Sequence, residues 1–438
     1  MKTITFGTDG IRGRVGDAPI DCQTILKLGW ALGKMIHDQY GSAKILIGKD
    51  TRISGYMIES LLEAGIIAAG CDAYLLGPVP TPGIAYLTTA FRAQASVVIS
   101  ASHNVFSDNG IKLFGADGFK FSDAQQAKFL SYFTQELSMV PSEKLGKATQ
   151  VHTAKERYVE FCKSKFPSSL RLDGMKIVVD SANGANYKVG PAVFYELGAE
   201  VIQLNDQPDG TNINRDCGSL HPQGLRQTVL DQEADVGIAF DGDGDRLVMV
   251  SSSGQILDGD DLLYILANYS RTSSMGVVGT EASNNGLKRS FTEKGIPYIQ
   301  TGVGDHEVVK ALQAQSWLIG GESSGHLIQL DKHSCSDAVI SALSVLAIML
   351  EQDADLDHLI KSFEKIPNKK LNIPLQSSFD IGPYAPHIHD IEKKLGTYGK
   401  LLIRPSGTEP VLRIQVESQN TRVLESSIAS MKALFTHG

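Results

Sequence analysis

Ala234-Asp-Val-Gly-Ile-Ala-Phe-Asp-Gly-Asp-Gly-Asp-Arg-Leu-Val-Met-Val250 is the stretch from which the rest of the chain can be interpreted. The apolar runs at its two ends have the composition of β-strands. Between them, Asp241, Asp243 and Asp245 are separated by single glycines, which permit a short turn. Carboxylates this close repel one another unless a cation lies among them, and such oxygen ligands suit Mg²⁺. The stretch therefore predicts a metal-binding loop.

Two other interpretations of this loop are less consistent with the residues. An EF-hand loop starting at Asp241 would need Gly and Glu at its sixth and twelfth positions, where the chain has Arg246 and Ser252. A plain hairpin turn would need only one Asp-Gly pair. Because Arg246 follows the aspartates directly, an anionic substrate such as a phosphate is expected beside the metal.

The overall composition sets limits on the class of protein. A length of 438 residues suits about three domains with separate cores. The net charge of −8, from 41 Lys and Arg against 49 Asp and Glu, argues against bulk nucleic-acid binding. The five cysteines show no Cys-x-x-Cys spacing and predict reduced thiols in the cytoplasm. No signal peptide is expected, and the longest apolar run, Ala338–Leu350, is too short to span a membrane.

Strands and helices alternate along most of the chain, which predicts parallel α/β units. A helix, a glycine and a strand follow one another at Gly70, Gly198 and Gly295, as expected for three related units. Residues 141–150 and 366–371 have the composition of linkers. The last part of the chain predicts a smaller unit with both strands and helices.

A polar loop, Ser100–Lys112, follows the predicted strand Ala95–Ser100. Ligands of open α/β sheets bind beyond the carboxyl ends of strands, so Ser102 is a candidate nucleophile or phosphate carrier; a simple polar turn is the alternative. Asn109-Gly110 predicts a turn, after which Lys112 would face either the same cleft or solvent.

Three further loops carry candidate ligand-binding residues, although each also has the composition of an exposed turn. In Gly7–Gly13, Arg12 is either a turn residue or a phosphate contact. In Gly320–His326, Glu322, Ser324 and His326 alternate, so an extended loop would point all three toward one side, where they suit sugar hydroxyls. The third loop has donors suited to a phosphate cradle, namely Arg404, Ser406, the Gly407 backbone and Thr408.

Together these loops resemble those of the α-D-phosphohexomutase family, over the whole chain and in the family's order. The resemblance lies in the metal loop Asp241–Arg246, the phosphoserine loop Ser100–Asn104, the sugar loop Gly321–His326 and the phosphate loop Arg404–Glu409. The opening Gly-Thr-Asp-Gly-Ile-Arg-Gly and the Gly-Glu-Ser-Ser-Gly-His form are most similar to the bacterial phosphoglucosamine mutase branch.

The resemblance implies an α/β fold of four domains around a central active-site cleft. Three related mixed α/β domains would occupy residues 1–150, 151–254 and 255–368. A smaller α+β domain would occupy residues 369–438.

The resemblance also implies the reaction, which interconverts glucosamine 6-phosphate and glucosamine 1-phosphate for cell-wall precursor synthesis. Ser102 would be the phosphoserine, and Mg²⁺ would be held by its phosphate and by the three aspartates. Glucosamine 1,6-bisphosphate would be the intermediate and activator. The implied partner is a small phosphosugar, without nucleic acid or membrane, and a homodimer is a candidate assembly.

The same resemblance implies roles for the remaining site residues. Glu322, Ser324 and His326 would bind hydroxyls, while Arg404, Ser406, Gly407 and Thr408 would hold the non-reacting phosphate. His103 and Lys112 would be candidate proton handlers, and Arg12 and Arg246 would stabilise charge.

The chain departs from the family pattern at three places. Val105 replaces the usual proline, which frees the backbone there. His306 replaces an arginine, and Ser336–Ala338 lacks the glycines common in the branch. A glucose or mannose phosphomutase, a non-catalytic sugar-phosphate binding protein and a metal-dependent phosphatase are the alternative functions.

Overall fold

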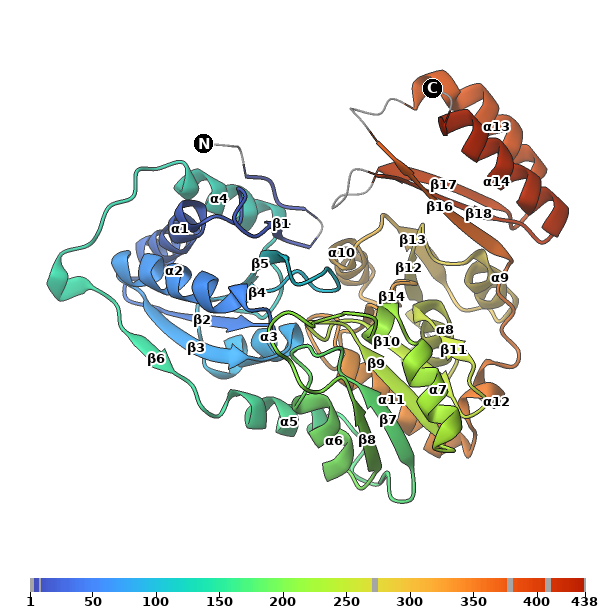
Figure 1. Cartoon of the computed structure of the whole chain (residues 1–438), viewed down its shortest axis with the longest axis horizontal. Helices are drawn as coiled ribbons and strands as arrows, with labels where there is room; N and C mark the ends of the chain where they lie inside the picture. The colour runs from blue at the N-terminus through green and yellow to red at the C-terminus, as the bar shows by residue number, and fades with distance from the viewer. Residues whose placement is uncertain (1–3, 8, 270–274, 376–380, 406–410, 437–438) are drawn as a thin grey trace.

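The computed structural model describes residues 4–7, 9–269, 275–375, 381–405 and 411–436. Successive parts of the chain form sheets of six, five, four and three strands. Figure 1 shows the four sheets, each with its helices, grouped around a common centre. The mixed α/β class expected from the sequence is confirmed by this arrangement.

The first sheet has the order β1-β5-β4-β2-β3-β6. Strands β2, β3, β4 and β6 run parallel, whereas β5 is antiparallel to both β4 and β1. One face packs against α1, α2 and α4, and the other against α3. The strands are β1 Ile11–Arg14, β2 Lys44–Lys49, β3 Asp72–Pro78, β4 Ala95–Ile99, β5 Asp108–Gly115 and β6 Ala148–Gln150, and the helices are α1 Cys22–Tyr40, α2 Ser54–Ala68, α3 Thr81–Ala90 and α4 Asp123–Phe133.

The second sheet has the order β11-β10-β9-β7-β8. Strands β9 and β10 form an antiparallel hairpin in which Phe240 pairs with Leu247, so residues 241–246 make a tight connection between them. The strands are β7 Lys176–Asp180, β8 Glu200–Leu204, β9 Val236–Phe240, β10 Leu247–Ser251 and β11 Ile256–Leu257, and the helices are α5 Ala154–Ser164, α6 Val189–Glu196 and α7 Gln223–Asp231.

The third sheet has the order β13-β12-β14-β15 and shares one continuous apolar core with the second. Helix α11 is buried along most of its length because its apolar residues continue around the whole helix. Among the helices that the structure describes, none has the length and apolar character that a membrane span needs. The strands are β12 Val277–Thr280, β13 Tyr298–Thr301, β14 Ile319–Gly321 and β15 Leu327–Gln329, and the helices are α8 Gly259–Tyr269, α9 Asn285–Glu293, α10 Asp305–Gln315, α11 Ala338–Gln352 and α12 Leu356–Ile360.

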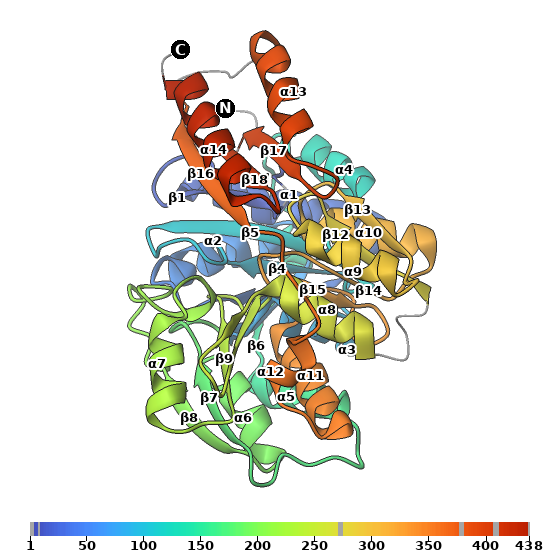
Figure 2. The same ribbon diagram turned by 90° about the vertical axis from the view of Figure 1, so that its right-hand side faces the viewer.

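The fourth sheet is antiparallel, with the order β16-β18-β17 and a small core of its own. Its two helices pack on one face, and Figures 1 and 2 show the strands between these helices and the rest of the molecule. The strands are β16 Asn368–Pro374, β17 Lys400–Pro405 and β18 Val411–Glu417, and the helices are α13 Ala385–Lys394 and α14 Thr421–Thr436.

Several local expectations from the sequence are wrong. Asn109-Gly110 is not a turn but lies within β5, where the backbone pairs with β4 and β1. The predicted linkers contain β6 and the beginning of β16. The domain limits stay a prediction. Strand β11 pairs with β10 in the second sheet, although it follows residue 254, the predicted end of the second domain.

Candidate active site

Ser102 lies just beyond the carboxyl end of β4, as its sequence position suggested. Its backbone is left-handed, with φ of 53°, and the side chain is fully buried. The Ser102 hydroxyl donates to Asp241 Oδ2 at 2.7 Å. A loop of the first sheet and a loop of the second therefore meet at a serine and a carboxylate.

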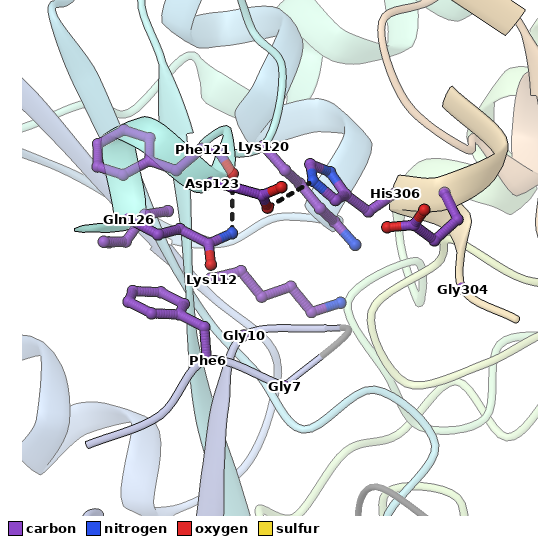
Figure 3. A pocket seen from close by; sticks show the side chains of 12 residues that line it. Phe6, Gly7, Gly10, Lys112, Lys120, Phe121, Asp123, Gln126, Gly304 and His306 are labelled. Atoms are coloured by element: carbon purple, nitrogen blue, oxygen red, sulfur yellow. Dashed lines mark hydrogen bonds and ion pairs between the residues drawn. The ribbon is translucent and has the colours of Figure 1, made fainter. Parts of the chain in front are cut away.

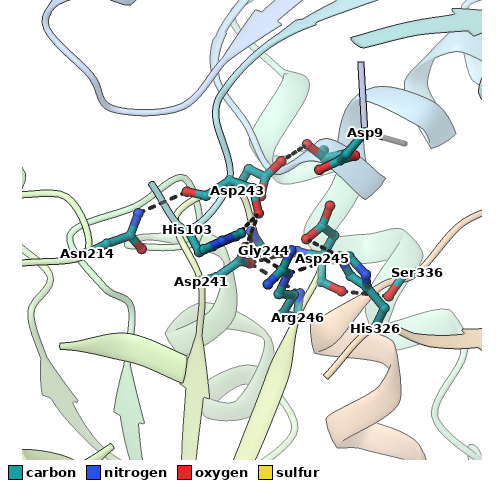
Figure 4. A network of polar contacts seen from close by, with 12 residues as sticks. Asp9, His103, Asn214, Asp241, Asp243, Gly244, Asp245, Arg246, His326 and Ser336 are labelled. Atoms are coloured by element: carbon teal, nitrogen blue, oxygen red, sulfur yellow. Dashed lines mark hydrogen bonds and ion pairs between the residues drawn. The ribbon is translucent and has the colours of Figure 1, made fainter. Parts of the chain in front are cut away.

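The three aspartates point inward from the turn between β9 and β10 (Figure 4). Asp241 Oδ1 accepts from the backbone N–H groups of Gly244, Asp245 and Arg246, at 3.0, 3.2 and 3.2 Å. These bonds fix the turn and leave Oδ2 directed at Ser102. One ligand oxygen from each aspartate lies within 4.8 Å of the other two.

Asp243 supplies the clearest sign of a cation site. Its Oδ2 accepts from the Thr81 hydroxyl at 2.6 Å, while its buried Oδ1 has no hydrogen-bond partner among the described residues. An unpaired buried carboxylate oxygen is costly unless a cation satisfies it. The donors are all oxygens, which suit a hard divalent ion such as Mg²⁺. The residues present therefore fit a magnesium ion.

Burial, together with the neighbouring charges of Asp245 and Asp243, raises the pKa of Asp241 to about 8. Burial also opposes ionisation of Asp245, but Lys112 beside it holds the pKa of Asp245 well below its usual range. The triad thus combines a carboxyl that resists ionisation with one that is fixed in the charged form. A divalent cation would favour ionisation of all three.

Lys112 projects from β5 into this acidic cluster, so the alternative that it faces solvent is wrong. Its Nζ donates to Asp243 Oδ2 at 2.7 Å and to Asp245 Oδ2 at 3.1 Å, and lies 3.2 Å from Asp9. Burial disfavours the ammonium, but these carboxylates outweigh it and raise the Lys112 pKa well above its usual range. Lys112 is therefore a fixed positive charge at the metal loop.

His103 lies on the cavity side of Ser102, with Nδ1 at 3.4 Å from the serine oxygen. Burial, together with the charges of Arg246 and Arg12, lowers the His103 pKa to about 2. The imidazole is consequently neutral and able to accept a proton. Arg12, on β1, pairs with Asp9 at the same cavity wall.

The alternation of its residues had suggested that the sugar loop is extended, but the structure shows a turn. Glu322 N–H donates to His326 O at 2.9 Å, which closes a turn. His326 bridges Glu322 Oε2 at 2.8 Å and Asp245 Oδ1 at 3.1 Å. Burial alone would lower its pKa, but Asp245 and Glu322 raise the His326 pKa to about 10. An Nε2 that donates to Asp245 cannot also accept from Arg246 Nε, so their 3.2 Å approach is a contact between cations among carboxylates.

A cavity of about 520 Å³ lies beside these groups, and its wall comes from all four sheets and their loops. Seven of the predicted residues line it, namely Arg12, His103, Arg246, Glu322, Ser324, His326 and Arg404, whereas Ser102, Lys112 and the three aspartates are buried behind its wall. Ser406, Gly407 and Thr408 lie outside the described residues. The lining consists of Thr5, Gly7, Asp9, Gly10, Arg12, Gly13, Arg14, His103, Asn104, Asp108, Arg246, Val303, Gly304, Asp305, Glu322, Ser324, His326, Arg404 and Arg413.

Arg404 and Arg413 form the cationic side of the cavity, on paired strands β17 and β18. Partial burial lowers the pKa of Arg404, and the adjacent charge of Arg413 contributes. Two guanidinium groups this close favour a doubly charged anion such as a phosphate between them.

At two of the positions where the sequence departs from the family pattern, His306 and Ser336, the side chains contact other parts of the protein and do not line the main cavity. His306 is outside the main cavity, in a neighbouring pocket of about 200 Å³, where Nε2 lies 3.6 Å from Asp123 (Figure 3). The Ser336 hydroxyl donates to Asp245 O at 2.6 Å and accepts from Leu327 N–H at 3.0 Å, so it supports the metal loop from behind.

Sequence reasoning missed several residues of the site. Asp9 and Arg413 face the cavity, while Thr81, Arg52 and Asn214 contact the reacting loops. Arg413 could have been found from its position opposite Arg404 on a neighbouring strand. The other contacts join residues far apart in the chain and leave no local pattern.

Comparison with protein-family models finds four matches in the order of the sheets. They are described as phosphoglucomutase/phosphomannomutase alpha/beta/alpha domain I at residues 3–139, domain II at 156–254, domain III at 258–366 and the C-terminal domain at 345–433. Together these matches extend over nearly the whole chain.

Curated relatives are similar over almost their full lengths. A phosphoglucosamine mutase of Alkalilimnicola ehrlichii is 50% identical over 424 residues, covering 95% of this chain and 94% of the relative. A phosphoglucosamine mutase of Legionella pneumophila strain Paris is 48% identical, covering 96% and 93%.

Solved structures share the fold. A phosphoglucomutase/phosphomannomutase family protein of Burkholderia thailandensis has a TM-score of 0.78 at 24% identity, covering 97% of this chain and 96% of that one. Aspergillus fumigatus N-acetylphosphoglucosamine mutase, in complex with GlcNAc-6P and magnesium, has a TM-score of 0.70 at 14% identity, covering 99% and 96%.

Proposed function

The chain belongs to the phosphoglucomutase/phosphomannomutase family, in its bacterial phosphoglucosamine mutase branch, and we propose that Ser102 carries the phosphoryl group that it transfers. It is an isomerase, and its reaction interconverts glucosamine 6-phosphate and glucosamine 1-phosphate. One observation carries the assignment of Ser102: the 2.7 Å contact between its hydroxyl and Asp241, beside a cavity lined by all four parts of the molecule.

Asp241, Asp243 and Asp245 would hold Mg²⁺ together with the phosphate on Ser102. The unpaired Asp243 Oδ1 and the all-oxygen donor set support this. When bound, the ion would neutralise negative charge on the phosphoryl group during transfer. The side chains around the ion would transfer the proton, stabilise charge and hold the substrate.

In the first transfer, the free sugar hydroxyl oxygen attacks the phosphorus on Ser102. The bond from phosphorus to Ser102 Oγ breaks as the bond to the sugar oxygen forms, and the hydroxyl proton leaves to a base. Neutral His103, at 3.4 Å from Ser102 Oγ, is the group best suited to take it. Lys112 is held protonated by its carboxylate partners, so we assign it to charge stabilisation.

In the second transfer, the resulting glucosamine 1,6-bisphosphate turns within the cavity and returns its other phosphate to Ser102. The proton returns to the sugar oxygen that the phosphorus leaves, so the protein ends in its starting state. Glu322, Ser324 and His326 would contact hydroxyls in either orientation, because they line the cavity from the turn between β14 and β15. Arg404, with Arg413 beside it, would hold the non-reacting phosphate.

Substrate choice is tested by kcat/KM for glucosamine 6-phosphate, glucose 6-phosphate and mannose 6-phosphate, with Mg²⁺ and the matching bisphosphates. A strong preference for the amino sugar supports the proposed function. Equal or reversed preference would contradict it and assign the protein to the hexose phosphomutases. A lack of turnover with all three would favour a non-catalytic sugar-phosphate binding protein.

A cytoplasmic location and a homodimer remain predictions from the sequence. Cell fractionation checks the first, and light scattering of the purified chain checks the second. The activator role of glucosamine 1,6-bisphosphate is checked by the dependence of the initial rate on its concentration.

A further inference from the structure

We propose that Arg52 is a positioning residue, which holds the loop Ser102–Asp108 in the shape that presents Ser102 to the metal loop. It acts through backbone carbonyl groups and does not line the main cavity. The inference rests on the proposed role of Ser102 and adds the group that keeps this serine in place.

The Arg52 guanidinium is fully buried just beyond β2, beneath the loop. Its Nε donates to Asp50 Oδ2 at 2.8 Å. The other four N–H groups donate to four carbonyl oxygens of one loop: Ser102 O at 3.0 Å, Asn104 O at 2.8 Å, Asp108 O at 3.1 Å and Val105 O. An arginine has five N–H donors in a fixed plane, so every donor of Arg52 is used.

The loop needs such support because its large apolar side chains contribute little burial to hold it in place. Val105 and Phe106 are 62% and 41% exposed, so they bury little apolar surface. Val105 also lacks the ring with which a proline would fix the backbone angle. Ser102 has a left-handed φ of 53°, which residues with a Cβ rarely adopt. Backbone hydrogen bonds must therefore maintain this conformation.

Asp50 links the backbone N–H and carbonyl groups of Ser102 through hydrogen bonds with Ser100 and Arg52. The Ser102 N–H donates to Ser100 Oγ at 2.9 Å, and the Ser100 hydroxyl donates to Asp50 Oδ2 at 2.6 Å. Arg52 joins Asp50 and returns to the Ser102 carbonyl. Both backbone polar groups of the reactive serine are thus fixed by one buried ion pair.

Asn214 reaches the same loop from the second part of the molecule. Its Nδ2 donates to Ser102 O at 2.9 Å and Asn104 O at 3.1 Å, the two oxygens that also accept from Arg52 Nη2. A carbonyl oxygen has two lone pairs, so both acceptors are saturated. Arg52 and Asn214 therefore act on one target, and their effects should be coupled.

Arg52→Lys is the first test variant, because it keeps a positive charge beside Asp50 but offers three donors without the planar fork. We expect kcat to fall about 10- to 100-fold, with KM changed less than about 2-fold, because a misplaced reactive group costs rate more than binding. The rate at which glucose 1,6-bisphosphate phosphorylates Ser102, followed by intact mass, should fall by the same factor.

Asn214→Gly is the second variant. It removes the donors without strain, because Asn214 has φ of 58° and glycine adopts such angles freely. We expect about a 3- to 10-fold fall in kcat. In the double variant the fall should differ from the product of the two single effects, because both residues act on the same carbonyl groups.

Lys49→Met is the matched control, since Lys49 is a buried cation at the end of β2, shortly before Arg52, and forms its ion pair with Glu59 instead of with the loop. It should lower the melting temperature without changing kcat for the folded enzyme. The inference is overturned if Arg52→Lys behaves in the same way, with Ser102 phosphorylated at the wild-type rate. If wild-type Ser102 is not phosphorylated at all, the proposed function fails instead, so the two failures are distinguishable.

Discussion

The reacting centre and the cationic wall of the cavity are built in different ways. Ser102, Lys112 and the three aspartates are at most 2% exposed, and they already contact one another. Arg404 and Arg413 are only partly buried, on a small antiparallel sheet with its own core. The first region has its geometry in place before a substrate binds, and the second presents charge to an open space.

This difference separates two kinds of contribution to the reaction. Groups fixed in the buried region are proposed to stabilise the phosphoryl group in transit, so they should affect kcat. Groups on the cationic wall are proposed to hold a phosphate that does not react, so they should affect KM. Each of the following variants either strengthens or breaks this division.

Asp243→Asn should have the largest effect. The change keeps the shape but removes the charge and the unpaired carboxylate oxygen proposed to bind the metal. We expect kcat to fall by about 10³-fold, together with loss of the dependence of rate on Mg²⁺. Initial rates over a Mg²⁺ titration check this, with Asp235→Asn at the far end of the same hairpin as the unaffected control. A rate near that of the wild type would mean that the metal loop is misassigned.

Arg404→Met should raise KM by about 10- to 100-fold, because charge-assisted hydrogen bonds contribute about 1.5–3 kcal/mol. The value of kcat should stay within about 3-fold, since the bound phosphate does not react. Steady-state kinetics on glucosamine 6-phosphate measure both constants. Lys369→Met, on the exposed edge of the same sheet, is the control. A fall in kcat at constant KM would break the division between the regions.

Thr81→Val tests a smaller contribution within the buried region. The valine keeps the shape of the side chain but removes the hydroxyl that donates to Asp243 Oδ2 at 2.6 Å. We expect a 5- to 10-fold fall in kcat, corresponding to about 1–1.5 kcal/mol, without a change in KM. Thr81→Ser should restore most of the rate. Equal activity of the valine and serine variants would show that the hydroxyl does not contribute.

Asp337→Asn should alter stability with pH and leave kcat unchanged. Burial raises the pKa of Asp337 to about 6, so its favourable contribution is full below about pH 4 and is lost as pH rises through 6. The wild type should therefore lose up to about 3 kcal/mol of unfolding free energy relative to the variant between pH 4 and 7. Denaturant unfolding at several pH values measures this difference. If the unfolding free energies of the wild type and the variant changed with pH in the same way, the raised pKa of Asp337 would be contradicted.

The sequence predicted those parts of the fold that depend on local composition. The strand predicted at Ala95–Ser100 is present as β4, Ala95–Ile99, because its apolar run ends at a polar loop. Asn109-Gly110 failed as a turn because pairing with two neighbouring strands outweighed its local preference. Helices α7 and α10 were not predicted.

The candidate site was predictable where one loop contains the whole pattern. The aspartates are such a case, because the turn itself brings them together. The support for this loop and for the Ser102 loop was not predictable, because Arg52, Asn214 and Thr81 reach their partners across 50, 112 and 162 positions of the chain. Such contacts arise only when strands or sheets that are distant in the sequence come together.

The most direct test of the central claim is to locate the phosphate on the enzyme. The purified chain, treated with Mg²⁺ and glucose 1,6-bisphosphate, would be analysed by intact mass and peptide mapping before and after excess glucosamine 6-phosphate. The account predicts one phosphate on Ser102 that is lost to the sugar, and no mutase activity in Ser102→Ala. A phosphate on another residue, or full turnover by Ser102→Ala with bisphosphate present, would contradict it.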